Sequence, residues 1–202
     1  VTAARVDHQE RRVFGRMASR LTALALNCTL GPPPAESSTQ LMIDQVLEAL
    51  RGHDVEGDTI RAVDHDIRPG VEVDMGDGDA WPGIRRLLDA DILLFATPTW
   101  VGHPSSVSQR IVERLDDQGR PLTFGKVARK ITGDLFQALN DCGFTVPAQG
   151  AVYWNGAAMS GVDYKDLDET PEAVARTTAT VAANAAHLAR HLVAEPYPGG
   201  KA

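Results

Sequence analysis

Three consecutive hydroxyl residues follow a short apolar segment near the start of the chain. The segment, Leu21 to Leu26, leads through a proline-rich stretch to Ser37, Ser38 and Thr39. Backbone N–H groups at the start of a helix lack partners within the helix, and hydroxyl groups beside them can also hold an anion. Together with Thr29, this stretch predicts a site for a phosphate monoester that needs no Lys or Arg.

A simpler interpretation of the same residues stays open. Ser37 and Gln40 have the spacing of a capping box, in which a hydroxyl residue merely starts its helix. Serine is among the preferred residues at that position. The hydroxyl cluster therefore points to a ligand only when it is combined with a second polar loop.

Such a loop follows the most apolar segment of the chain, Ile92 to Thr97. It contains an aromatic ring at Trp100, a flexible Gly102 and a neighbouring His103. A flat aromatic ligand can stack on an indole, which favours a pocket at this loop. The alternative, that Trp100 packs on its own chain or on another subunit, also stays open.

Alternating strands and helices are expected to position these two loops. Uninterrupted apolar runs are typical of parallel strands buried on both faces, and apolar residues three and four apart indicate helices. The chain then forms a doubly wound parallel sheet that binds ligands beyond the carboxyl ends of its strands. We expect strands at 21–26, 55–63, 92–97 and 145–153, and helices after Ser37, at 84–88, after Ser105, at 131–142 and from Thr170.

From about Leu21 to Leu192 the chain resembles the flavodoxin-like NAD(P)H-dependent FMN reductases and their quinone-reductase relatives. The resemblance implies a five-stranded sheet in the order 2-1-3-4-5 and a bound FMN. By position, the FMN phosphate would lie at Thr29, Ser37, Ser38 and Thr39. The isoalloxazine would be bordered by Pro98, Thr99, Trp100, Val101 and Gly102, with His103 adjacent and Trp154 as a further part of the pocket.

One part of this fold has no obvious counterpart in the sequence. A strand and a loop should precede the helix that starts near Ile131, yet only Lys126, Val127 and Ala128 lie directly before Arg129. In the order 2-1-3-4-5 the missing fourth strand would lie inside the sheet. We therefore hypothesise that residues are omitted between about Ala128 and Arg129, which an intact mass above 21.7 kDa would support.

Composition excludes several other classes of protein. The net charge of −7, with scattered arginines, argues against nucleic acid as a partner. Two distant cysteines and six histidines without ligand spacing argue against a metal site and favour a reducing cytoplasm. No apolar run approaches the roughly 20 residues of a membrane helix, so we expect no membrane. Residues 1–20 are expected to be an extension or leader, and residues 21–202 one domain.

Known phosphate motifs are also absent. A tyrosine phosphatase with Cys28 as nucleophile would need an arginine at the position of Pro34. The spacing of Gly119, Gly125 and Lys126 does not match a nucleotide-binding P-loop. Neither phosphoryl chemistry is supported.

The resemblance implies an oxidoreductase that passes hydride from NADPH or NADH through FMN to a quinone, a flavin or a similar small acceptor. The cofactor would carry the chemistry, so no catalytic side chain is expected. A homodimer or higher homo-oligomer is also implied. Two alternatives are a flavodoxin-type electron carrier without NAD(P)H activity and a flavin-free interaction domain.

Overall fold

Successive side chains of the first strand are buried in two different hydrophobic clusters. Along β1 (Leu21–Asn27), Ala23 and Ala25 belong to one cluster of buried residues, whereas Leu24 and Leu26 belong to another. Successive side chains of a strand point to opposite faces. Both faces of this strand are therefore covered, as its continuous apolar run predicts.

The computed structural model describes residues 20–72, 74–76, 86–87, 89–115, 123–126, 129–157 and 161–197. Its main sheet consists of four parallel strands in the order β2-β1-β3-β6. The other three strands of the sheet span Val55–Arg61 (β2), Ile92–Ala96 (β3) and Thr123–Lys126 (β6). The order of β2, β1 and β3 confirms the parallel, doubly wound arrangement expected from the sequence.

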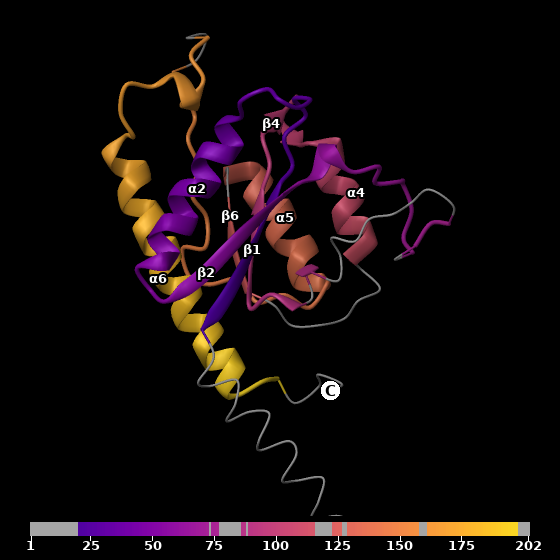
Figure 1. Ribbon diagram of the computed structural model, residues 1–202, viewed down its shortest axis with the longest axis vertical. Coiled ribbons are helices and arrows are strands. Elements are labelled where there is room, and N and C mark those ends of the chain that lie inside the picture. The colour runs from indigo at the N-terminus through magenta and orange to yellow at the C-terminus, as the bar shows by residue number, and fades with distance from the viewer. Residues whose placement is uncertain are drawn as a thin grey trace, which may run out of the picture.

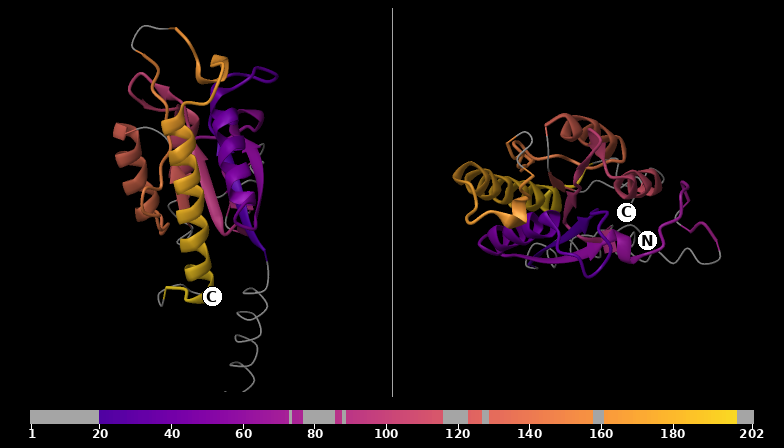
Figure 2. Two further views of the ribbon diagram at one scale, coloured as in Figure 1. Left: turned by 90° about the vertical axis from the view of Figure 1, so that its left-hand side faces the viewer. Right: turned by 90° about the horizontal axis from the view of Figure 1, so that it is seen from above.

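Helices lie on both faces of this sheet (Figures 1 and 2). On one face, α2 (Ser38–Arg51) and α6 (Glu172–Ala194) contribute to a cluster with β1 and β3. On the other face, α4 (Ser106–Leu115) and α5 (Arg129–Asp141) pack against the opposite side chains of the same strands. The described chain also contains two short 3-10 helices, η1 (Ala62–Asp64) and η3 (Tyr164–Asp166).

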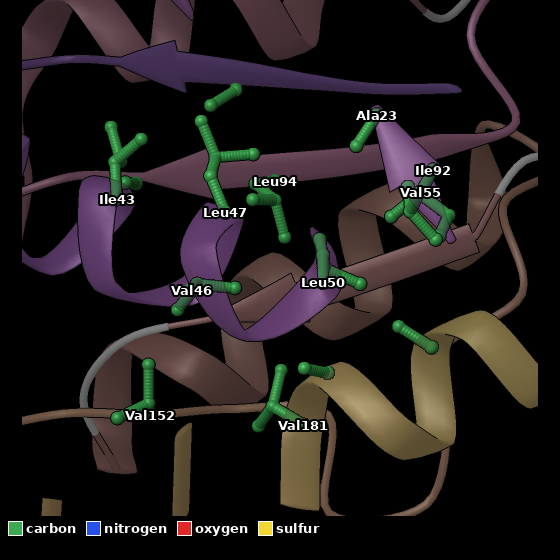
Figure 3. Packing of buried hydrophobic residues seen from close by; sticks show 14 of the residues in the cluster. Ala23, Ile43, Val46, Leu47, Leu50, Val55, Ile92, Leu94, Val152 and Val181 are labelled. Carbon is green, nitrogen blue, oxygen red and sulfur yellow. The ribbon is translucent and has the colours of Figure 1, made fainter. Parts of the chain in front are cut away.

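Packing between α2 and the sheet follows from the helical spacing of apolar residues. Ile43, Val46, Leu47 and Leu50 recur on one face and are buried among the residues shown in Figure 3. Complete burial of a leucine such as Leu50 contributes about 1.5–3 kcal/mol. This face fixes α2 on the sheet, so the start of the helix is held at the end where β1 terminates.

The hypothesis that the fourth strand is missing is wrong, because β6 is the fourth strand of the sheet. β6 pairs in parallel with β3 from Ile92 opposite Thr123 to Phe95 opposite Lys126. Only residues 127 and 128 then separate it from α5. The four-residue strand contains Gly125 and lacks an apolar run, which is why its sequence did not indicate a strand. The structural reason for supposing omitted residues therefore disappears.

The expected strand at 145–153 is also wrong. The four-stranded sheet of the described residues does not include it, and strand-like pairing is limited to the single positions Thr145 and Ala151. Pro147 lacks an N–H group, and Gln149 has a φ of 52° that breaks the extended conformation. Gly150 N instead donates to Pro147 O at 3.0 Å, so this segment turns. The five-strand order is thus not observed.

Some predictions fall on residues outside the ranges that the structure describes. The leader at 1–20 is described only from Arg20, and the short helix expected at 84–88 only at 86 and 87. The expected starts of the later helices are confirmed at Ser106 and Glu172, each within two residues of the predicted hydroxyl or proline signal.

Candidate functional site at the carboxyl edge of the sheet

Two neighbouring strands end at the same level. Asn27, the last residue of β1, pairs with Ala96, the last residue of β3. Beyond them, the N–H group of Cys28 donates to the carbonyl oxygen of Ala96 at 2.8 Å. The loops that leave both strands therefore start side by side at the carboxyl edge of the sheet, where doubly wound folds bind ligands.

A buried serine ties these two loops together. Ser105 is fully buried, and its hydroxyl donates to the carbonyl oxygen of Cys28 at 2.7 Å. The same hydroxyl accepts from Ser108 N at 3.2 Å, which caps the start of α4. Ser105 N in turn donates to the Thr97 hydroxyl at 2.9 Å. One side chain thus links the loop after β3, the end of β1 and a helix terminus.

The hydroxyl cluster lies at the start of α2. Ser37 is the residue before the helix, and its hydroxyl accepts from Gln40 N at 3.3 Å, so the capping interpretation is correct for this residue. Ser38 and Thr39 form the first turn, with Thr39 almost completely buried. Their backbone N–H groups belong to the set that a helix cannot satisfy internally. A capped helix start still offers these donors to an anion.

Thr29 is held near this helix start through a buried amide. Asn27 is fully buried, and its Oδ1 accepts from Thr29 N at 3.0 Å. Its Nδ2 donates to Gln40 Oε1 in the first turn of α2 at 2.9 Å. Asn27 therefore connects two parts of the expected phosphate loop. Asn27 was not among the predicted site residues, although its place at the end of a buried strand is the signal that would have found it.

Arg61 also contacts this loop. It is the last residue of β2 and pairs in register with Asn27 of β1. Its Nη2 donates to the carbonyl oxygens of Gly31 at 2.6 Å and Ala35 at 3.1 Å. A cation therefore lies against the stretch between Thr29 and Ser37, although the loop itself contains no Lys or Arg.

The loop after β3 forms a small hairpin that the sequence analysis did not expect. β4 (Thr99–Trp100) and β5 (His103–Pro104) pair in antiparallel fashion, with Trp100 opposite His103. Val101 and Gly102 form its turn with φ values of 50° and 78°. Two successive positive φ values are typical of tight hairpin turns, and glycine adopts them without strain.

This hairpin presents its aromatic residue to the outside. Trp100 is 63% exposed and Val101 is 86% exposed, whereas Pro98 is partly buried. In Figure 1, β4 and the start of α2 lie at the same end of the molecule. The structure therefore brings the expected ring-binding loop and the expected phosphate loop to one edge of the sheet.

A third segment reaches the same edge from the C-terminal half. Lys165 N donates to the Ser38 hydroxyl at 3.2 Å, and the Tyr164 hydroxyl donates to Gln45 Oε1 at 2.7 Å. Gln45 Nε2 donates to the Thr170 hydroxyl at 2.8 Å. These contacts fasten residues 164–170 along α2. No local pattern in the sequence indicates them, because the paired residues lie more than 100 positions apart.

Lys165 carries a positive charge beside this helix start. A hydrogen bond from its Nζ to Asp166 Oδ1, at 2.6 Å, raises the pKa of the ammonium group above its ordinary value. The negative charges of Asp166, Asp163 and Glu36 act in the same direction. Lys165 is therefore protonated at neutral pH.

Trp154, the remaining expected site residue, has different neighbours. Its ring lies against Tyr164 with centroids 5.6 Å apart and planes tilted by 53°. It also lines an open cavity of about 480 Å³ together with Leu167, Asp168, Glu169 and Pro171. Trp154 thus packs on the segment that precedes α6, and its place in a cofactor pocket stays a prediction.

Two features that the described residues lack bear on function. None of the described helices has both the length and the hydropathy required to span a bilayer. Within the same residues, no group of three or more His, Cys, Asp or Glu side chains is arranged to hold a metal ion.

Comparison with known proteins gives this edge a context. The family described as NADPH-dependent FMN reductase matches residues 22–157. The 8-demethyl-8-aminoriboflavin-5'-phosphate synthase of Streptomyces davaonensis is 30% identical over 207 residues, covering 88% of this chain and 80% of that protein. The divalent metal cation transporter MntH of Mycobacterium bovis is 37% identical over 169 residues, covering 72% of this chain. The matched region is only 25% of the length of that transporter.

Solved structures agree with this relationship. RosB, crystallised with 8-demethyl-8-formylriboflavin-5'-phosphate, superposes with a TM-score of 0.71 at 27% identity, covering 88% of this chain and 82% of RosB. A flavodoxin of Streptococcus pneumoniae superposes with a TM-score of 0.54 at 16% identity, covering 83% and 99% of the two chains. The second match shows that the fold is flavodoxin-like. The family match over most of the chain, together with the relative at 30% identity, places this protein in the NADPH-dependent FMN reductase family.

Proposed function

We propose that this chain binds FMN across the two tied loops and passes hydride from NADPH or NADH through it to a small acceptor such as a quinone or a free flavin. The observation that carries the proposal is the hydrogen bond from Ser105 to the Cys28 carbonyl. It holds the loop with the exposed Trp100 beside the loop that leads to the start of α2. A molecule with a flat ring at one end and a phosphate at the other spans such a pair of loops.

The donor chemistry at the start of α2 fits a phosphate. The N–H groups of Ser38 and Thr39 lie in the first turn, and the positive end of the helix dipole favours an anion there. The Ser38 hydroxyl accepts from Lys165 N, which leaves its own proton available to a phosphate oxygen. Thr29, Ser37, Ser38 and Thr39 are therefore our proposed phosphate residues.

The hairpin fits the ring end of the cofactor. Trp100 offers an exposed indole face, and offset stacking on such a face stabilises an aromatic ligand by about 0.5–1.5 kcal/mol beyond area burial. The backbone from Pro98 to Gly102, with His103 beside it, would border the ring. We propose Trp154 as a more distant wall, because it packs toward the segment before α6.

Bound FMN supplies the capacity to accept and release hydride, and the protein positions it. The residues named above bind and orient: hydroxyls and N–H groups fix one end, and the hairpin fixes the other. Holding donor and acceptor in contact converts an encounter in solution into a reaction within one complex. No protein nucleophile is required for this transfer.

The relatives support a phosphorylated flavin as the ligand. The Streptomyces davaonensis protein is named for a riboflavin-5'-phosphate derivative, and RosB was crystallised with another. Membership in a reductase family favours an enzyme over the two alternatives, an electron carrier and a flavin-free interaction domain.

An anaerobic titration tests the proposal. Purified protein saturated with FMN is mixed with NADPH or NADH, and flavin absorbance is followed with free FMN at the same concentration as the control. We expect the protein-bound flavin to bleach much faster than free FMN and to regain its colour when a quinone is added. Binding of FMN without nicotinamide-dependent bleaching would identify an electron carrier. Failure to bind FMN would contradict the proposal altogether.

Assembly into a homodimer or larger homo-oligomer is a further part of the proposal. The exposed Trp100 and Val101 at the hairpin tip are apolar surface that a second subunit would cover. Sedimentation equilibrium of the FMN-loaded protein measures the mass directly. A mass of one chain at micromolar concentration would contradict this part and leave the flavin site unaffected.

A further inference from the structure

The loop between β1 and α2 has few backbone donors of its own. Pro32, Pro33 and Pro34 lack N–H groups, and Ala35 N is already bonded to Pro32 O at 3.0 Å. Many phosphate-binding loops are rich in glycine, because successive backbone N–H groups then point at the anion. This loop must obtain its shape and its positive potential in another way.

Arg61 provides a contact that shapes the loop. Its Nη2 bonds the carbonyl oxygens of Gly31 and Ala35, on the two sides of the proline triplet. A trans peptide points its carbonyl and its N–H in opposite directions. Because the Ala35 carbonyl is directed at Arg61, the N–H of Glu36 is directed to the other side of the loop. One guanidinium therefore fixes the peptide that leads into the start of α2.

The setting of Arg61 makes this contact rigid. Its side chain is only 20% exposed, and its Nε lies 3.8 Å from Asp64 Oδ1 in η1. The Nε atom is buried and has no hydrogen-bond partner among the described residues. Arg61 also ends a strand that is paired along its whole length with β1. Neither the guanidinium nor the strand that carries it can move far from the loop.

Charge adds a second effect. Glu36 is the one charged residue between Cys28 and Thr39, so the loop by itself is acidic. A phosphate monoester carries up to two negative charges at neutral pH. The guanidinium of Arg61 offsets part of this negative charge.

We propose that Arg61 is a positioning residue that makes this site select phosphorylated flavin, FMN, over unphosphorylated riboflavin. This inference rests on the proposed function, because it assigns the phosphate to the start of α2. Arg61 acts through the loop: it holds the carbonyls that orient the phosphate donors and lowers the cost of placing an anion there. The contacts of Arg61 in the described part of the chain are with the loop and η1, and the hairpin proposed for the isoalloxazine is not among them.

The test compares two ligands on each variant. Kd values for FMN and riboflavin are measured by fluorescence titration on the wild type, Arg61→Met and Arg61→Lys. For Arg61→Met we expect a loss of FMN affinity of about 10- to 100-fold with riboflavin affinity unchanged within about twofold, since bonds to charged groups are stronger than neutral ones. Arg61→Lys keeps the charge but loses the two-carbonyl geometry of the guanidinium. The logarithm of its FMN Kd should therefore rise by about a third to a half as much as that of Arg61→Met.

Arg86→Met is the matched control. Arg86 pairs with Asp58 of β2, its side chain is half exposed, and its removal changes the net charge equally. Its guanidinium donates to this carboxylate and not to a carbonyl of the loop. We expect Kd values for both ligands to match the wild type. If circular dichroism shows that Arg61→Met does not fold, the FMN and riboflavin Kd values of Arg61→Lys test the inference instead.

The outcomes separate this inference from the proposed function. A wild-type protein that binds no FMN contradicts the proposed function. If the wild type binds FMN but the Arg61 variants lose affinity for FMN and riboflavin by the same factor, the role of the arginine is merely structural. That result overturns the inference. Unchanged FMN affinity in the Arg61 variants also overturns it.

Discussion

The hydroxyl of Ser105 donates a 2.7 Å hydrogen bond to the carbonyl oxygen of Cys28, which joins the loop after β3 to the end of β1. Both groups are buried, and the pair is 77 positions apart in the sequence. A buried carbonyl that loses its partner costs the free energy of its desolvation. This bond therefore affects both the stability of the domain and the alignment of the two loops.

Ser105→Ala removes this bond together with the cap of α4. We expect the free energy of unfolding to fall by about 1–3 kcal/mol, because the buried bond to the Cys28 carbonyl and the cap at Ser108 N are both lost. Urea denaturation followed by circular dichroism measures the change. Ser106→Ala, at an exposed neighbouring position, is the control and should change stability by less than about 0.5 kcal/mol. Equal stability of the two variants would contradict the structural role of Ser105.

The double substitution Ser38→Ala with Thr39→Ala removes two proposed phosphate donors. We expect FMN affinity to fall by about 10-fold or more while the domain stays folded, because the backbone of α2 and its Ser37 cap are retained. Fluorescence titration and thermal unfolding measure the two effects. Thr177→Ala with Thr180→Ala removes two hydroxyls from partly exposed positions of α6 and should leave FMN binding unchanged. An unaltered FMN titration in the first double variant would refute the phosphate assignment.

Trp100→Ala tests the ring end of the site. We expect FMN and riboflavin to lose affinity by the same factor, about 2- to 12-fold, because stacking involves the ring that both ligands share. The melting temperature should stay near that of the wild type, since the indole is 63% exposed. Trp100→Phe retains an aromatic face and should recover most of the affinity. A loss confined to FMN would place Trp100 near the phosphate instead.

Tyr164→Phe removes the hydroxyl that bonds Gln45 on α2. Tyr164 is buried, so its loss of a hydrogen bond should lower stability by about 1 kcal/mol and speed amide exchange across residues 164–170. Hydrogen exchange with mass spectrometry shows the local change, and urea denaturation shows the global one. Tyr153→Phe, at a 38% exposed position, is the control. Identical exchange in the two variants would mean that the Tyr164 hydroxyl does not fasten this segment.

Much of the architecture could be predicted from local patterns. The apolar runs at β1 and β3 and the helical spacing around Ile43 identified buried strands and a packed helix. These patterns are reliable because burial on one or two faces imposes a period of two or of 3.6 residues on the chain itself. The two polar loops followed from where those runs end.

Other features depended on residues far apart in the chain. The Thr123–Lys126 strand has no apolar run of its own and is defined by pairing with β3, whereas 145–153 looked extended but turns at Pro147 and Gln149. The contacts of Arg61 with Gly31 and of Lys165 with Ser38 likewise join distant positions. Residue types and their spacing thus determined the buried strands β1 and β3, the packed helices and the location of two polar loops. Only the folded chain decided which cation, hydroxyl and aromatic ring share that edge, because strand pairing and helix packing set those distances.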